Sequence, residues 1–154
     1  MMRAATLHAP SRRTVLAGAV AAAALATGAA VTIRRDRFDG TRMSPTEVLD
    51  AVRAGEILLL DIRRPDEWDE TGIGEGAHPI DMRRDDFEAE LTMLTGGRKN
   101  TPVALICARG VRSDRMGARL AEEGFTRIVD VPQGMLGSAA GPGWLELDLP
   151  VVRP

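Results

Sequence analysis

The sequence predicts an α/β fold in which helices cover both faces of a mostly parallel β-sheet. Three observations support this prediction: apolar runs of strand length, helical segments between them, and glycine or proline at the boundaries. Strands that are apolar at nearly every position are buried on both faces, as in parallel sheets. Alternation of such strands with helices favours the same architecture. The chain has 154 residues, enough for one domain of ordinary size.

The first helix and the first strand have the clearest signals. Ser44 is followed by Pro45 and then by Glu47, three residues after the serine. This is a capping box with proline at the first helical position, so we expect a helix that begins at Ser44 and ends at Gly55. The run 57–62 is apolar except for one aspartate, which predicts a strand buried on both faces.

The later elements alternate in type along the chain. Proline begins the short helical turn, apolar residues at helical spacing mark the longer helices, and glycines end them. In chain order we expect a helical turn (64–70), a strand (77–82), a helix (83–97), a buried strand (101–107), a helix capped by Ser113 and stopped by Gly124 (113–124), a strand (127–132) and a glycine-rich irregular tail (134–152).

The first thirty residues have the composition of a targeting segment. There is no acidic residue up to Ile33, and the apolar run 15–31 consists mostly of alanine and glycine. A basic head before a mild apolar core is the layout of a secretory signal, and residues 11–16 resemble the twin-arginine export motif. We therefore expect residues 1–30 to be a signal peptide and the protein to be periplasmic or otherwise exported. The alternative is an uncleaved anchor, with residues 15–31 associated with the membrane.

Composition limits the partners of the remaining chain. Residues 31–42 are polar and without periodicity, so we expect a linker there and a folded domain over 43–154. Removing the three arginines of residues 1–30 leaves 17 of the 20 basic residues against 22 acidic ones, a net charge of about −5. We expect no binding to nucleic acid, because this balance is acidic and no aromatic-plus-basic stripe is present. We also expect a monomer.

The chain has one cysteine and two histidines. One cysteine cannot form an internal disulfide, and these residues are too few for the usual sets of metal ligands. We expect no cofactor. The cysteine ends the predicted strand 101–107 and is followed, before the next helix, by Ala108, Arg109, Gly110, Val111 and Arg112.

The position of Cys107 favours a catalytic cysteine over a structural one. In open α/β sheets ligands bind beyond the carboxyl ends of the strands, and a tight loop before a helix offers N–H groups and the positive end of the helix dipole to an anion. Such surroundings favour a thiolate, and Arg109 and Arg112 add positive charge. The alternative is a structural cysteine at a strand end. A Cys–His pair would need His78, which we expect to be a polar surface residue.

Three motifs give the chain from about residue 43 to 153 a resemblance to a single-domain rhodanese, a member of the sulfurtransferase family. Residues 107–113 resemble the family's C-x-x-G-x-R-S loop, and residues 72–77 resemble its G-H-I-x-G-A segment, with Ile73 where histidine is usual. The D-x-R-x-x-x-E-[WFY] signature is matched by Asp61, Arg63, Glu67 and Trp68. The resemblance implies a rhodanese-like fold with a central five-stranded sheet.

The resemblance also implies a mechanism. Cys107 would take a sulfane sulfur from a small-molecule donor such as thiosulfate and pass it, as a persulfide, to cyanide or a thiol. The N–H groups of residues 108–112 would hold the persulfide, and Arg112 would attract a sulfonate or fix the loop. We expect Asp61, Arg63 and Glu67 to be structural, with Arg63 and Glu67 paired at the strand-to-helix corner. Trp68 is expected in the core.

Two other functions stay open. One is a non-catalytic rhodanese module that binds sulfur species or a partner protein. The other is a phosphatase or arsenate reductase, whose related loops resemble C-x5-R. Here Arg112 follows Cys107 after four residues, and the smaller loop suits a single sulfur atom better than a tetrahedral oxyanion.

Overall fold

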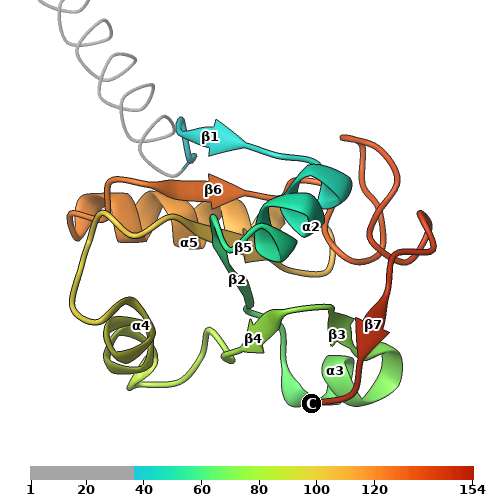
Figure 1. Ribbon diagram of the computed structural model, residues 1–154, viewed down its shortest axis with the longest axis horizontal. Coiled ribbons are helices and arrows are strands. Elements are labelled where there is room, and N and C mark those ends of the chain that lie inside the picture. The colour runs from blue at the N-terminus through green and yellow to red at the C-terminus, as the bar shows by residue number, and fades with distance from the viewer. Residues whose placement is uncertain (1–36) are drawn as a thin grey trace, which may run out of the picture. The chain divides into compact units, whose positions relative to one another are not determined.

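The computed structural model describes residues 37–154 (Figure 1). The predictions for residues 1–30, a signal peptide or a membrane anchor, therefore lie outside the described part of the chain. Five parallel strands form the central sheet in the order β1 (Thr41–Arg42), β6 (Ile128–Asp130), β5 (Val103–Ile106), β2 (Leu58–Asp61) and β4 (Ala77–Pro79). A separate antiparallel pair joins β3 (Ile73–Gly74) to β7 (Val151–Val152). The predicted α/β class and its five-stranded parallel sheet are confirmed.

Within residues 37–154 there are four helices: α2 (Pro45–Arg53), α3 (Pro65–Thr71), α4 (Phe87–Thr95) and α5 (Val111–Glu122). Helices α4 and α5 cover one face of the sheet, where Leu91 and Leu120 pack against Leu105 in an apolar cluster. Helix α2 covers the other face, where Val48 packs in a second cluster with Trp144 from the C-terminal segment. Figure 1 shows α2 and α5 on opposite sides of β5 and β6. No helix within residues 37–154 is long and apolar enough to cross a bilayer.

The capping box of α2 forms as the sequence predicts. The Glu47 backbone N–H donates to the Ser44 hydroxyl, and the Glu47 carboxylate accepts from the Ser44 backbone N–H at 2.7 Å. The two runs predicted to be fully buried strands become β2 and β5, which lie side by side in the middle of the sheet. Their position explains why these two runs carry the strongest apolar pattern.

The N-terminal boundary of the folded part differs from our expectation. Within the expected linker 31–42, Phe38 is only 4% exposed and Thr41–Arg42 form β1, which pairs with β6. An edge strand of two exposed residues has no apolar alternation, so the sequence gives no signal for it. The compact unit begins at Arg37 rather than at residue 43.

Two helices begin at other residues than the sequence predicts. Helix α4 begins at Phe87 instead of residue 83; before the helix, Arg83 pairs with Asp81 and Arg84 pairs with Asp86. Helix α5 begins at Val111 instead of Ser113, with Gly110 as its N-cap. The loop after Cys107 is therefore shorter than expected, and Val111 and Arg112 belong to the first helical turn.

Candidate active site

The cysteine lies at the centre of the carboxyl edge of the sheet. Cys107 directly follows β5, which pairs with β2 on one side and β6 on the other. The chain then turns at Gly110, whose φ is 84°, and enters α5. A side chain could not replace this glycine, because a Cβ there would lie 2.1 Å from the carbonyl oxygen of Pro132. Gly110 thus has the role in the turn that the sequence predicts.

The backbone after the cysteine carries a run of free donors. None of the N–H groups from Ala108 to Ser113 has an acceptor within residues 37–154. The first that has one belongs to Asp114, whose N–H donates to the Gly110 carbonyl at 3.0 Å. The first-turn N–H groups of a helix are unpaired by geometry and carry the positive end of its dipole. The loop and the start of α5 therefore offer an anion several donors together.

The thiol itself is covered. Cys107 is 1% exposed and belongs to the apolar cluster under α4 and α5. Its sulfur lies 3.6 Å from the Ser113 hydroxyl oxygen, and that hydroxyl also donates to the Gly110 carbonyl at 3.0 Å. The burial fits the alternative of a structural cysteine, whereas the free N–H groups beside it fit a nucleophile.

Arg112 is fixed by an ion pair with α3. Its guanidinium donates to both carboxylate oxygens of Glu67, at 2.6 and 2.7 Å. The arginine lowers the pKa of Glu67, and the glutamate raises the pKa of Arg112, with a smaller contribution from nearby Cys107. The guanidinium is therefore already engaged by Glu67. We expected Arg112 either to attract a sulfonate or to fix the loop, and this geometry matches the second role.

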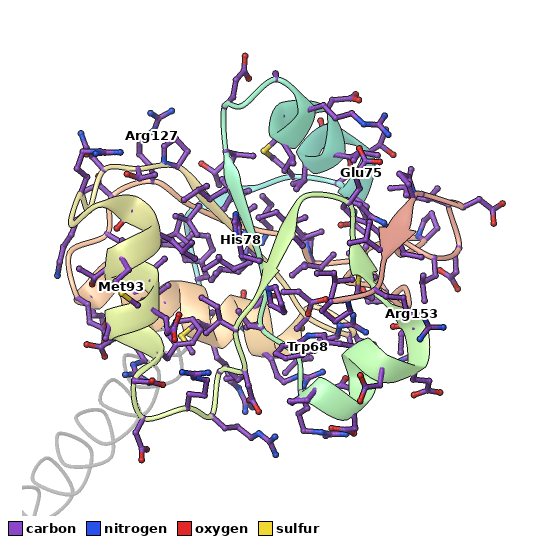
Figure 2. All side chains as sticks on the ribbon, turned by 60° about the horizontal axis from the view of Figure 1, so that its bottom comes forward. Trp68, Glu75, His78, Met93, Arg127 and Arg153 are labelled. Carbon is purple, nitrogen blue, oxygen red and sulfur yellow. The ribbon has the colours of Figure 1, made fainter. Side chains whose placement is uncertain are left out.

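The prediction that the side chains of Arg63 and Glu67 form an ion pair is wrong. Arg63 is 1% exposed, and its guanidinium binds the buried carboxylate of Asp61 at 2.7 Å. It also donates to the backbone carbonyls of Gly72 and Glu67. The Arg63 side chain turns beneath α3 and holds its backbone, so the Glu67 carboxylate remains free to reach Arg112. Trp68, which we expected in the core, is only partly buried on α3 (Figure 2).

The segment that supports the loop from the C-terminal side is not predicted by the sequence. Met135 and Leu136 donate backbone N–H groups to the carbonyls of Cys107 and Ala108, at 2.8 and 2.9 Å. The exposed Arg109 side chain donates to the Gly137 carbonyl at 3.2 Å. The glycines of the tail were the available signal for this close approach. Gly134 has a φ of 67°, and a Cβ at this position would have no room beside Ala108.

His78 lies elsewhere. It sits within β4, opposite Leu60 of β2, and is half-buried rather than at the surface as expected (Figure 2). Its side chain lines a cavity with Glu56, Arg98 and other residues, and Cys107 is not in that lining. The structure does not bring a Cys–His pair together here.

The comparisons with known proteins agree with this geometry. The chain belongs to the rhodanese-like domain family, whose model matches residues 44–139. It is similar to a tRNA uridine(34) hydroxylase of Aster yellows witches'-broom phytoplasma, 25% identical over 103 residues, which covers 67% of this chain and 33% of the relative. It is also similar to a tRNA sulfurtransferase of Shewanella pealeana, 28% identical over 88 residues, covering 57% of this chain and 18% of the relative. The chain thus spans a third or less of these curated relatives.

A solved structure matches over most of both chains. It is the polysulfide-sulfur transferase homodimer from Wolinella succinogenes, with 26% identity and a TM-score of 0.60. The match covers 79% of this chain and 85% of that one. The relation therefore extends over most of both chains, rather than over one motif.

Proposed function

We propose that the protein is a sulfurtransferase that carries a sulfane sulfur on Cys107 as a persulfide. The observation that carries the proposal is the run of unpaired N–H groups from Ala108 to Ser113 directly after the cysteine. Such donors stabilise an anion without a counter-charge of their own. Membership of the rhodanese-like family and the similarity to a polysulfide-sulfur transferase support the same chemistry.

The transfer balances as two displacements. The Cys107 thiolate attacks the outer sulfur of thiosulfate, the sulfur–sulfur bond of the donor breaks, and sulfite leaves with the electron pair. Cyanide or a thiolate then attacks the outer sulfur of the persulfide, and the Cys107 thiolate is released. The anionic outer sulfur of the persulfide would accept hydrogen bonds from the loop N–H groups. No general base is required while the thiol remains ionised.

The charged side chains have separate tasks in this proposal. Arg112 holds the loop to α3 through its ion pair with Glu67. Arg109 is exposed at the mouth of the loop and is the cation available to draw in an anionic donor. Because the sulfur is covered, access requires a small displacement of the loop side chains.

We propose small-molecule donors and acceptors rather than RNA. The relatives named for tRNA are proteins of which this chain covers a third or less, and the net charge of about −5 over residues 31–154 opposes binding to phosphate backbones. We further propose that the protein acts as a monomer in the periplasm, released by cleavage after residues 1–30 or anchored by residues 15–31. Intact mass of protein recovered from the periplasm tests the cleavage.

Specific observations bear on the alternatives. The buried thiol, 1% exposed, favours a non-catalytic rhodanese module that binds a partner, and retained partner binding in Cys107→Ser would support that function. Phosphatase or arsenate reductase activity is disfavoured, because the loop is C-x4-R and Arg112 is paired with Glu67.

The test of the main proposal uses the full chain. Incubation with thiosulfate and cyanide should yield thiocyanate, and Cys107→Ser should abolish it. Met93→Ala, at a position on α4 that is 70% exposed, is a control that should keep full activity. After thiosulfate alone, the intact mass should increase by one sulfur atom, and a reductant should remove it. Thiocyanate no higher than in the protein-free blank would reject the proposal.

A further inference from the structure

A cavity of about 350 Å³ lies at the amino edge of the central sheet and has no role in the proposed function. Leu58, the first residue of β2, and Pro102, directly before β5, both line it. Cys107 follows the opposite end of β5. The cavity and the candidate active site therefore lie at opposite edges of the sheet.

Both faces of the sheet contribute to the wall of this cavity. Leu58 and Leu94 line it and pack against the apolar cluster under α4 and α5. Val52 and Ile57 line it as well, but they pack against the cluster that α2 covers. The cavity therefore extends around the rim of the sheet, with one side towards α4 and another towards α2.

Arg98 and His78 belong to the α4 side of the cavity. Arg98 comes shortly after Thr95, the last residue of α4. His78, labelled in Figure 2, pairs with Leu60 of β2, and Leu60 packs in the cluster under α4 and α5. Paired residues on neighbouring strands point to the same face of a sheet, so the imidazole lies on this face too.

The turn that carries Arg98 also carries a hydroxyl group without a partner. Thr101 lines the cavity, and its backbone N–H donates to the Arg98 carbonyl at 3.4 Å. Its Oγ1 is buried and has no hydrogen-bond partner within residues 37–154. Buried polar groups nearly always have a partner, so this hydroxyl favours a polar ligand in the cavity.

Glu56 belongs to the α2 side. It follows α2 and directly precedes Ile57, and it lines the same cavity as Arg98. Within residues 37–154 neither Glu56 nor Arg98 forms an ion pair, with each other or with another side chain. One cavity thus has a cation on one side and an anion on the other, and the two do not neutralise each other.

We propose that this cavity binds a small zwitterion, an α-amino acid with an aliphatic side chain. Arg98 binds the carboxylate, with His78 and the Thr101 hydroxyl as neighbouring polar groups, and Glu56 accepts from the ammonium group. Opposite charges that do not pair with each other are both matched only by a ligand that carries both charges. The aliphatic residues of the wall contact the aliphatic side chain of the ligand.

The test uses L-leucine as the probe, added to the isotope-labelled full chain and followed by amide chemical shifts. Saturable shifts are expected at Glu56, His78 and Thr101, with a dissociation constant of about 1 mM or lower. Isocaproate lacks the ammonium group of leucine, and isoamylamine lacks the carboxylate. Each should bind about tenfold more weakly than leucine. Equal affinity of leucine and either analogue would overturn the proposal, and so would shifts that do not saturate.

Substitution of each charged residue should weaken one half of the interaction. Arg98→Gln and Glu56→Gln change exposed side chains and should each weaken leucine binding about tenfold. Glu56→Gln should leave isocaproate binding unchanged, because that analogue has no ammonium group. Arg98→Gln should likewise leave isoamylamine binding unchanged. The opposite pattern would contradict the assigned orientation of the ligand.

Arg127→Gln is the matched control. Arg127 precedes β6 at the same edge of the sheet and is exposed, but it lines a neighbouring cavity and not this one. Its substitution should change leucine binding by less than about twofold. Equal weakening by Arg127→Gln and Arg98→Gln would show a general charge effect and reject the site.

Cys107→Ser separates this proposal from the proposed function. Leucine should bind this variant as tightly as wild type, because the cysteine is at the other edge of the sheet. Weaker binding would place leucine at the cysteine loop and overturn the proposal. Absence of thiocyanate formation in a protein that still binds leucine would reject only the proposed sulfur transfer.

Discussion

The ion pair between Glu67 and Arg112 can be tested by Glu67→Gln. The pair joins α3 to the first turn of α5 through two charge-assisted hydrogen bonds, at 2.6 and 2.7 Å. The side chains are 16% and 29% exposed, so the pair lies between a surface ion pair, which contributes up to about 1 kcal/mol, and a buried one, whose disruption costs about 3–5 kcal/mol. We expect Glu67→Gln to lower the free energy of unfolding by about 2 kcal/mol.

The pH dependence follows from the direction of the pKa shift. Arg112 is the largest cause that lowers the pKa of Glu67 from its ordinary 4.5. A group whose pKa is lower in the folded state stabilises the fold above the unfolded pKa and loses that contribution as pH falls through the folded value. The difference between wild type and Glu67→Gln should therefore be full at pH 7 and diminish as pH falls below 4.5.

Thermal and urea unfolding followed by circular dichroism measure this effect. A loss of about 2 kcal/mol corresponds to a melting temperature roughly 6–12 °C lower for a domain of this size. Thiocyanate formation should fall as well, because Arg112 no longer holds the loop. Glu70→Gln, an exposed position on the same helix, should leave both unchanged. Identical melting of Glu67→Gln and wild type at pH 7, or a difference that persists unchanged in acid, would refute this reasoning.

Three further substitutions test the scaffold. Arg63→Met leaves the buried carboxylate of Asp61 without its cation and should cost about 3–5 kcal/mol in urea unfolding; a neutral result would mean that the pair adds nothing to stability. Gly110→Ala forces a side chain at a φ of 84° and 2.1 Å from the Pro132 carbonyl oxygen, so a loss of about 2–4 kcal/mol and of thiocyanate formation is expected, and full activity would contradict the loop geometry. Phe38→Ala should cost about 3 kcal/mol by calorimetry, whereas an unchanged melting temperature would place this ring outside the core.

The sequence by itself determined the parts of the protein that depend on neighbours along the chain. The apolar runs that become β2 and β5 indicated a parallel sheet, and the capping box at Ser44 indicated the start of α2. The glycine after Cys107 indicated a tight turn into a helix, and Gly110 has the positive φ that this turn requires. These features could be predicted because caps, strand burial and turns are each set by a few consecutive residues.

Only the tertiary structure decided which charged groups meet. Glu67 pairs with Arg112, 45 residues further on, while Arg63 turns back to Asp61. With nineteen arginines in the chain, spacing alone favoured the nearest partner. Likewise, no local pattern could show that Met135 and Leu136 would donate to the carbonyls of Cys107 and Ala108, because these hydrogen bonds require the C-terminal segment to pack against the loop. Long-range pairing depends on how elements dock, and docking is a property of the whole packed core rather than of any one segment.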